Sequence, residues 1–90
     1  MKIVAFHNDK KGMAIRFLSQ EIRLMKPGCN IAVVESVTKD SLPKVDYLFV
    51  KDSLCLAFMG NGRIYELKSD GNDMHAYHAE VMALLPEILA

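Results

Sequence analysis

The fold is decided by residues 2–37, KIVAFHNDKKGMAIRFLSQEIRLMKPGCNIAVVESV, in which two apolar runs flank an amphipathic stretch. The runs Lys2–His7 and Asn30–Val37 carry apolar residues without alternation, as strands do when both of their faces are covered. Between them, Met13–Met25 repeats apolar residues at the spacing of one helix face. This order predicts a strand, a helix and a second strand, with the two strands forming a parallel pair joined by a right-handed crossover. The helical stripe consists of Ile15, Leu18, Ile22 and Met25.

Residues at both ends of this helix match the sequence signals for the start and the end of a helix. Asn8 or Asp9 can cap the first turn, because a short polar side chain accepts hydrogen bonds from free backbone N–H groups. Pro27-Gly28 ends the helix, since proline cannot continue the helical hydrogen bonds and glycine tolerates the reversal that follows.

The second half of the chain predicts three further strands. These are Val45–Val50, Leu54–Met59 and Arg63–Lys68, with a hairpin turn at Gly60-Asn61-Gly62 before the last one. In Arg63–Lys68, Ile64 and Leu67 are interspersed with charged residues, which is typical of an edge strand with one solvated face.

A second helix closes the chain. Asp73 is a suitable N-cap, and Pro86 should end or kink the helix near Leu85. The apolar stripe expected to face the sheet consists of Met74, Tyr77, Val81, Leu84 and Ile88.

The composition restricts the class of protein. Ninety residues form one domain, 1–90, and 51% hydrophobic residues exclude a disordered chain. Lys and Arg number 11, as do Asp and Glu, so no nucleic-acid partner is expected. The apolar runs are too short to span a bilayer and no signal peptide is visible, so no membrane partner is expected either. Cys29 and Cys55 match no metal spacing, which favours reduced thiols without a disulfide and a cytoplasmic location.

The element order resembles the thioredoxin-like fold, in which a β-α-β unit precedes a hairpin and a C-terminal helix. Pro43 lies before the third strand, where that family keeps a cis-proline. The loop Asn8–Gly12 stands where the family carries CxxC, and it contains no cysteine, which excludes thiol–disulfide catalysis there. The resemblance implies an α/β (α+β) domain in β-α-β-β-β-β-α order, with a mixed four- to five-stranded sheet and two helices.

Residues 1–52 also resemble the receiver domain of response regulators. Asn8-Asp9 is similar to the acidic end of its first strand, and Asp52 would be the phospho-acceptor beside a bound Mg²⁺. That arrangement needs a parallel third strand, for which a crossover takes about a dozen residues. Ser36–Lys44 offers nine residues, interrupted by Pro43, so the sequence favours an antiparallel third strand that separates Asp52 from Asp9.

Two further groups are candidates for binding chemistry. The loop after the first strand offers cations, amides and an acid/base group, although a solvated turn explains the same residues. His75 and His78 could share a metal at i, i+3 spacing, but no third ligand is visible, and His78 also fits a semi-buried flank position. No catalytic serine motif or cofactor-binding glycine pattern occurs, so no cofactor is expected. The loop residues are His7, Asn8, Asp9, Lys10 and Lys11.

Apolar residues beside the main stripes suggest contact with another protein. Phe17 and Leu24 either seat the first helix more deeply or form a patch for a partner. Ile64 and Glu66 lie on the expected edge strand, which could accept another strand or a second copy of the chain. The sequence thus favours a non-catalytic interaction module whose partner is another protein or itself. The alternatives are a phospho-acceptor or enzyme using His7, Asp9 and Asp52, and a helix-borne metal site.

Overall fold

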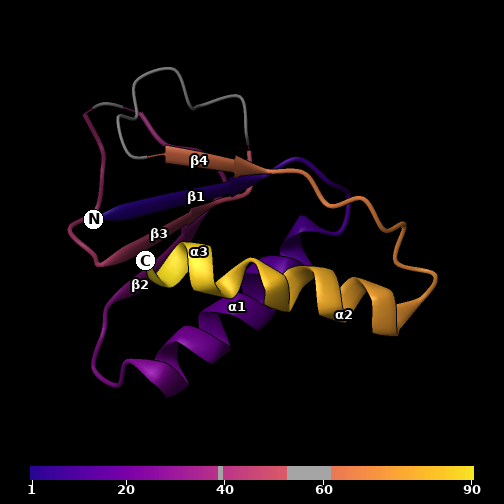
Figure 1. The fold of residues 1–90 in the computed structure, drawn as a ribbon. Helices are drawn as coiled ribbons and strands as arrows, with labels where there is room; N and C mark the ends of the chain where they lie inside the picture. Colours follow the sequence, from indigo (N-terminus) through magenta and orange to yellow (C-terminus); the bar gives the residue numbers. More distant parts are fainter. Residues whose placement is uncertain (39, 53–61) are drawn as a thin grey trace.

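The computed structural model describes residues 1–38, 40–52 and 62–90, which form four strands and three helices (Figure 1). The predicted strand Leu54–Met59 lies outside the described residues, as do Gly60 and Asn61 of the predicted hairpin. Every other predicted element is present, with small shifts at its ends. In chain order the elements are β1 (Lys2–Phe6), α1 (Lys11–Met25), β2 (Ile31–Val34), β3 (Tyr47–Val50), β4 (Gly62–Tyr65), α2 (Met74–Ala83) and α3 (Leu85–Leu89).

The four described strands form an entirely parallel sheet in the order β2-β3-β1-β4. β3 pairs with β2 on one side and β1 on the other, and β4 pairs with the free side of β1. The α/β class is therefore confirmed, whereas the mixed sheet and the antiparallel third strand of the thioredoxin-like order are wrong. None of the described residues follows a cis peptide bond, so Pro43 does not match the cis-proline of that family either.

The position of β3 explains why a short connection suffices. We expected the third strand beyond β1, but it lies between β2 and β1. The chain therefore moves sideways by one strand spacing, about 4.8 Å, and back along one short strand. The twelve residues between Val34 and Tyr47 can do both, since an extended chain spans about 3.3 Å per residue. This segment also supplies Val37 and Val45, which pack on the sheet face opposite the helices.

The opening strand–helix–strand unit is only partly as predicted. β1 and β2 run in the same direction, but β3 separates them, so they form no hydrogen-bonded pair. β1 is central and its residues Ile3–Phe6 are buried, as expected for a strand covered on both faces. β2 is an edge strand instead, and Val33 is 43% exposed.

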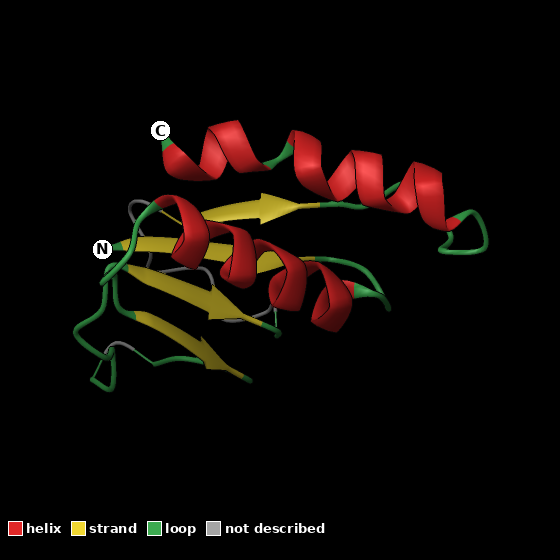
Figure 2. Cartoon of the chain, turned by 90° about the horizontal axis from the view of Figure 1, so that it is seen from below, coloured by secondary structure: helices red, strands yellow, loops and turns green. Residues whose placement is uncertain are grey.

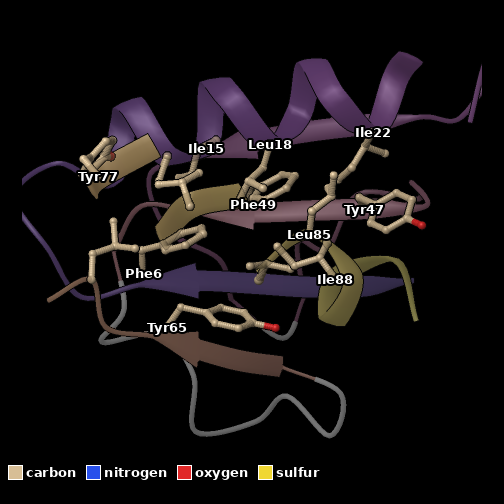
Figure 3. Close-up of a cluster of buried hydrophobic side chains, with 14 residues drawn as sticks. Phe6, Ile15, Leu18, Ile22, Tyr47, Phe49, Tyr65, Tyr77, Leu85 and Ile88 are labelled. Atoms are coloured by element: carbon tan, nitrogen blue, oxygen red, sulfur yellow. The ribbon is translucent and has the colours of Figure 1, made fainter. Parts of the chain in front are cut away.

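Both helical segments cover one face of the sheet, which gives a two-layer arrangement (Figure 2). The core lies between the layers, where side chains of β1, β3 and β4 meet those of α1, α2 and α3 (Figure 3), and Ile31 of β2 packs against it. Ile15, Leu18 and Ile22 are buried there as predicted, but Met25 is 54% exposed because α1 ends beyond the sheet contact. No helix in the described part of the chain is long and apolar enough to cross a membrane.

The helix ends follow the sequence signals closely. Pro27-Gly28 ends α1, and Gly28 has a φ of 87°, the left-handed conformation that glycine adopts without strain. Asp73 caps α2 by accepting hydrogen bonds from the backbone N–H groups of His75 and Ala76. The helix breaks at Leu84, one residue earlier than the kink predicted from Pro86.

Candidate functional site

The loop after β1 is held in place by Asn8. Its Oδ1 accepts a hydrogen bond from the Lys10 backbone N–H at 2.6 Å, and its Nδ2 donates to the Leu67 carbonyl at 2.8 Å. Lys10 itself occupies the N-cap position of α1 without a side-chain cap, so neither Asn8 nor Asp9 caps the helix as predicted. Asn8 therefore fixes this loop to the chain after β4, which accounts for its amide without a ligand.

Because β1 and β3 run in the same direction, Asp9 and Asp52 follow the carboxyl ends of two neighbouring strands. β1 and β3 are parallel neighbours with Ala5 opposite Val50, so the segments that follow them leave side by side. The prediction that an antiparallel third strand separates the two carboxylates is therefore wrong. Within residues 1–38, 40–52 and 62–90, however, no group of three or more metal-ligating side chains gathers, here or around His75 and His78.

A mostly apolar surface follows the line where α1 and α2 meet. The Phe17 ring lies 4.9 Å from the His78 ring in an edge-to-face arrangement, so these flanks of the two helices face each other. Helical spacing of four and seven residues places the remaining members on the same flanks. We call this the interhelix surface; it consists of Met13, Phe17 and Leu24 from α1 and Met74, His78 and Met82 from α2.

The interhelix surface is partly open to solvent. Leu24 is 74% exposed, Met74 50% and Met13 40%, while Phe17 and Met82 are half-buried against the core. Phe17 thus seats α1, whereas Leu24 lies on the outside. His78 is exposed rather than semi-buried. Methionine side chains adapt to differently shaped partners, which makes such a surface suited to docking.

The solvent side of α2 and α3 is also apolar. Ala76, Ala79, Ala83 and Pro86 are exposed and follow one another at helical spacing. A helix covering a core from one side normally carries charged and polar residues on the other. α1 obeys this rule with Arg16, Gln20 and Arg23, but α2 and α3 do not.

Charges of opposite sign accompany the two helical segments. Residues 10–26 contain five basic residues and one acidic residue, Glu21, whereas residues 70–90 contain four acidic residues and no lysine or arginine. The basic residues are Lys10, Lys11, Arg16, Arg23 and Lys26, and the acidic ones are Asp70, Asp73, Glu80 and Glu87.

Two polar contacts hold the helical layer in position. The Tyr77 hydroxyl donates a hydrogen bond to the Lys10 carbonyl at 2.8 Å, and burial raises the pKa of this phenol. The Glu80 carboxylate accepts hydrogen bonds from the backbone N–H groups of Lys68 and Ser69. Burial alone would raise the pKa of Glu80, but these hydrogen bonds outweigh it and lower the pKa.

A pocket of about 740 Å³ lies at the other end of the strands, where they begin. Its lining combines basic, aromatic and apolar side chains from β1, β3, β4 and the ends of α1 and α3. A smaller pocket of about 490 Å³ adjoins it and shares Met1 and Asp46. The lining of the larger pocket includes Lys2, Lys26, Cys29, Tyr47, Arg63 and Leu89.

Cys29 carries a free thiol, while Cys55 lies outside the described residues. On β4, the outermost of the four described strands on its side, Ile64 is 50% exposed. Glu66, just after β4, is also exposed, whereas Tyr65 and Leu67 face the core. Comparisons with protein-family models, with curated proteins and with solved structures found no match to this chain. The functional conclusions below therefore depend on residues of this chain alone.

Sequence reasoning missed two features for different reasons. The exposed alanines of α2 were readable, because residues 74–89 are apolar around most of the helix rather than on one stripe. The meeting of Lys2, Lys26 and Arg63 at one pocket was not readable. These three residues are far apart in the chain, and the strand order together with the packing of α1 brings them together.

Proposed function

We propose that this chain is a non-catalytic protein-interaction domain that self-associates through its helical layer. The observation that carries the proposal is the apolar character of α2 on both its core side and its solvent side. Leu24 and Met74 extend this exposed apolar area across the interhelix surface. Burying such an area against a protein surface removes it from water, which is the main driving force for association.

Charge favours a second copy as the partner. A two-fold axis through the interhelix surface places α1 of one protomer against α2 of the other, so basic residues face acidic ones twice. Arg16 and Arg23 then oppose Glu87 and its neighbours, and all three residues are exposed in the single chain. Any other partner would have to present both an acidic and a basic patch at the same spacing.

The test is sedimentation equilibrium of the wild-type chain and of matched aspartate variants. Leu24→Asp should weaken self-association at least tenfold, because a desolvated carboxylate would enter the apolar contact. Ile64→Asp is the control, since Ile64 is similarly exposed but lies on β4 at the edge of the sheet. Dissociation by Ile64→Asp alone would transfer the interface to that edge, and a wild-type monomer at every concentration would overturn self-association.

Charge reversal tests the arrangement of the interface. The double variant Arg16→Glu with Arg23→Glu should lose self-association, and it should bind a variant carrying Glu87→Lys. Added salt should weaken the wild-type dimer, because exposed charges are screened. Self-association that is indifferent to both the charge reversal and the salt would contradict the two-fold arrangement.

The direction of β3 favours a second candidate function. Parallel β1 and β3 place Asp9 and Asp52 at one edge of the sheet, as a phospho-acceptor with a bound Mg²⁺ requires. Acetyl phosphate with Mg²⁺ should then label the wild type and not Asp52→Asn. Labelling that persists in Asp52→Asn, or no labelling of the wild type, removes this candidate.

A further inference from the structure

The pocket where the strands begin has the size of a small-molecule site. Its volume of about 740 Å³ lies within the range of about 300–1,000 Å³ that such sites occupy. Lys26, which follows α1, and Leu89 of α3 line it, and the C-terminal ends of these two helices lie apart on the side where the strands begin (Figure 1). It lies at the opposite end of the strands from the loops considered above, and it shares no residue with the interhelix surface.

Three cations from three separate elements line this pocket. Lys2 is the first residue of β1, Lys26 follows α1, and Arg63 belongs to β4. The single acidic side chain in the lining is Asp46, whose Oδ2 accepts a hydrogen bond from the Asn30 backbone N–H at 2.8 Å. Positive charge is therefore in excess among the lining side chains.

Two of these cations already have contacts that orient them. Lys26 Nζ donates to the Tyr47 hydroxyl at 2.9 Å and lies 5.6 Å from the centre of its ring. Lys2 Nζ donates to the Ile88 carbonyl at 2.6 Å, which offsets the negative end of α3. Without Lys2, the carbonyl groups at this helix end would repel an anion in the pocket.

Arg63 is the cation whose presence these contacts leave unexplained. Within the described ranges its guanidinium makes no hydrogen bond and no ion pair, although it lines the pocket together with Leu89. On the same face of β4, the buried Tyr65 hydroxyl also has no partner in that part of the chain, and it points toward this end of the sheet (Figure 3). Buried hydroxyls without a partner are rare in folded proteins.

We propose that this pocket binds a small organic anion carrying a phosphate or carboxylate group. Arg63 provides the primary contact, because its planar guanidinium can donate two parallel hydrogen bonds to either group. Lys26 and Lys2 add charge, and Tyr47 and Leu89 contact the organic part of the ligand. This site is independent of the proposed self-association.

The test is NMR titration of the chain with inorganic phosphate and, separately, with acetate, each at constant ionic strength set by chloride. Both arms measure shifts of the backbone amides of Cys29, Tyr47 and Gly62. Saturable shifts with one anion identify the preferred group. Shifts that stay linear with both anions, or that spread evenly over the chain, would overturn the proposal.

Matched variants separate the pocket from general charge. Arg63→Gln should lower the association constant at least tenfold, with Arg63→Lys between it and the wild type, since lysine lacks the paired donors. Lys51→Gln is the control, because Lys51 lies at the far end of the strands, 3.4 Å from Glu35. An equal loss in Lys51→Gln and Arg63→Gln would show that net charge alone attracts the anion.

Discussion

α1 and the α2–α3 segment cover the same face of the sheet, but they present different surfaces to solvent. α1 buries Ile15, Leu18 and Ile22 and turns charged residues outward, so packing on the sheet accounts for most of its pattern, but Leu24 is 74% exposed. α2 buries Tyr77 and Val81 yet exposes alanines on its opposite side. Both helices therefore carry apolar residues beyond the needs of the fold, α1 at Leu24 and α2 along its alanine side, and α2 differs in lacking charged residues on that side.

The largest expected effect tests the core side of this comparison. Leu18→Ala should lower the free energy of unfolding by about 2–5 kcal/mol, because Leu18 is fully buried and its removal leaves a cavity. Leu24→Ala on the same helix should change it by less than about 0.5 kcal/mol in the monomer, as exposed sites do. Urea denaturation at a concentration where the chain is monomeric measures both. Similar losses would contradict the one-sided burial of α1.

The next effect concerns the cap at the start of α2. Asp73→Ala should lower the free energy of unfolding by about 0.5–2 kcal/mol, since the Asp73 carboxylate caps two backbone N–H groups of α2. Asp73→Asn should restore most of the loss, because asparagine supplies the same acceptor. Thermal unfolding followed by circular dichroism gives both values. An equal loss in the two variants would mean that the charge, rather than the acceptor, is responsible.

A smaller effect tests the link between the helices. Tyr77→Phe should lower the free energy of unfolding by about 0.5–1.5 kcal/mol, since it removes the hydrogen bond to the Lys10 carbonyl. Tyr65→Phe is the matched control, because the Tyr65 hydroxyl has no partner in the described part of the chain. Denaturant unfolding of the anion-free protein should show this control to be neutral or slightly stabilised. A greater loss in the control than in Tyr77→Phe would reverse the assignment.

The smallest effect is a dependence on pH. The folded-state pKa of Glu80 is lowered, so its carboxylate stabilises the fold above the unfolded-state value of 4.5 and loses this contribution as pH falls through the folded value. Glu80→Gln should therefore be less stable than the wild type at pH 7, by less than about 1 kcal/mol, because solvent still screens this partly buried carboxylate. Unfolding measured from pH 7 to pH 3 should show the two stabilities converging. A constant gap would contradict this role.

Local signals predicted the elements well because the residues that determine them are neighbours in the chain. The 3.6-residue spacing in Met13–Met25, the stop at Pro27-Gly28 and the cap at Asp73 each act within a few residues. The candidate loop was less predictable. Asn8 suits a helix cap, but its amide is used by the Leu67 carbonyl, 59 residues away in the chain.

The sequence by itself determined the type, the order and the approximate position of the described strands and helices. The tertiary structure decided the direction and position of β3. Its apolar run fits either beyond β1 or between β2 and β1, and only the packing of the whole chain selects the second position. That choice places Asp9 and Asp52 at the same end of the strands. At the other end, the pairing of β1 with β4 and the end of α1 bring Lys2, Arg63 and Lys26 to one pocket.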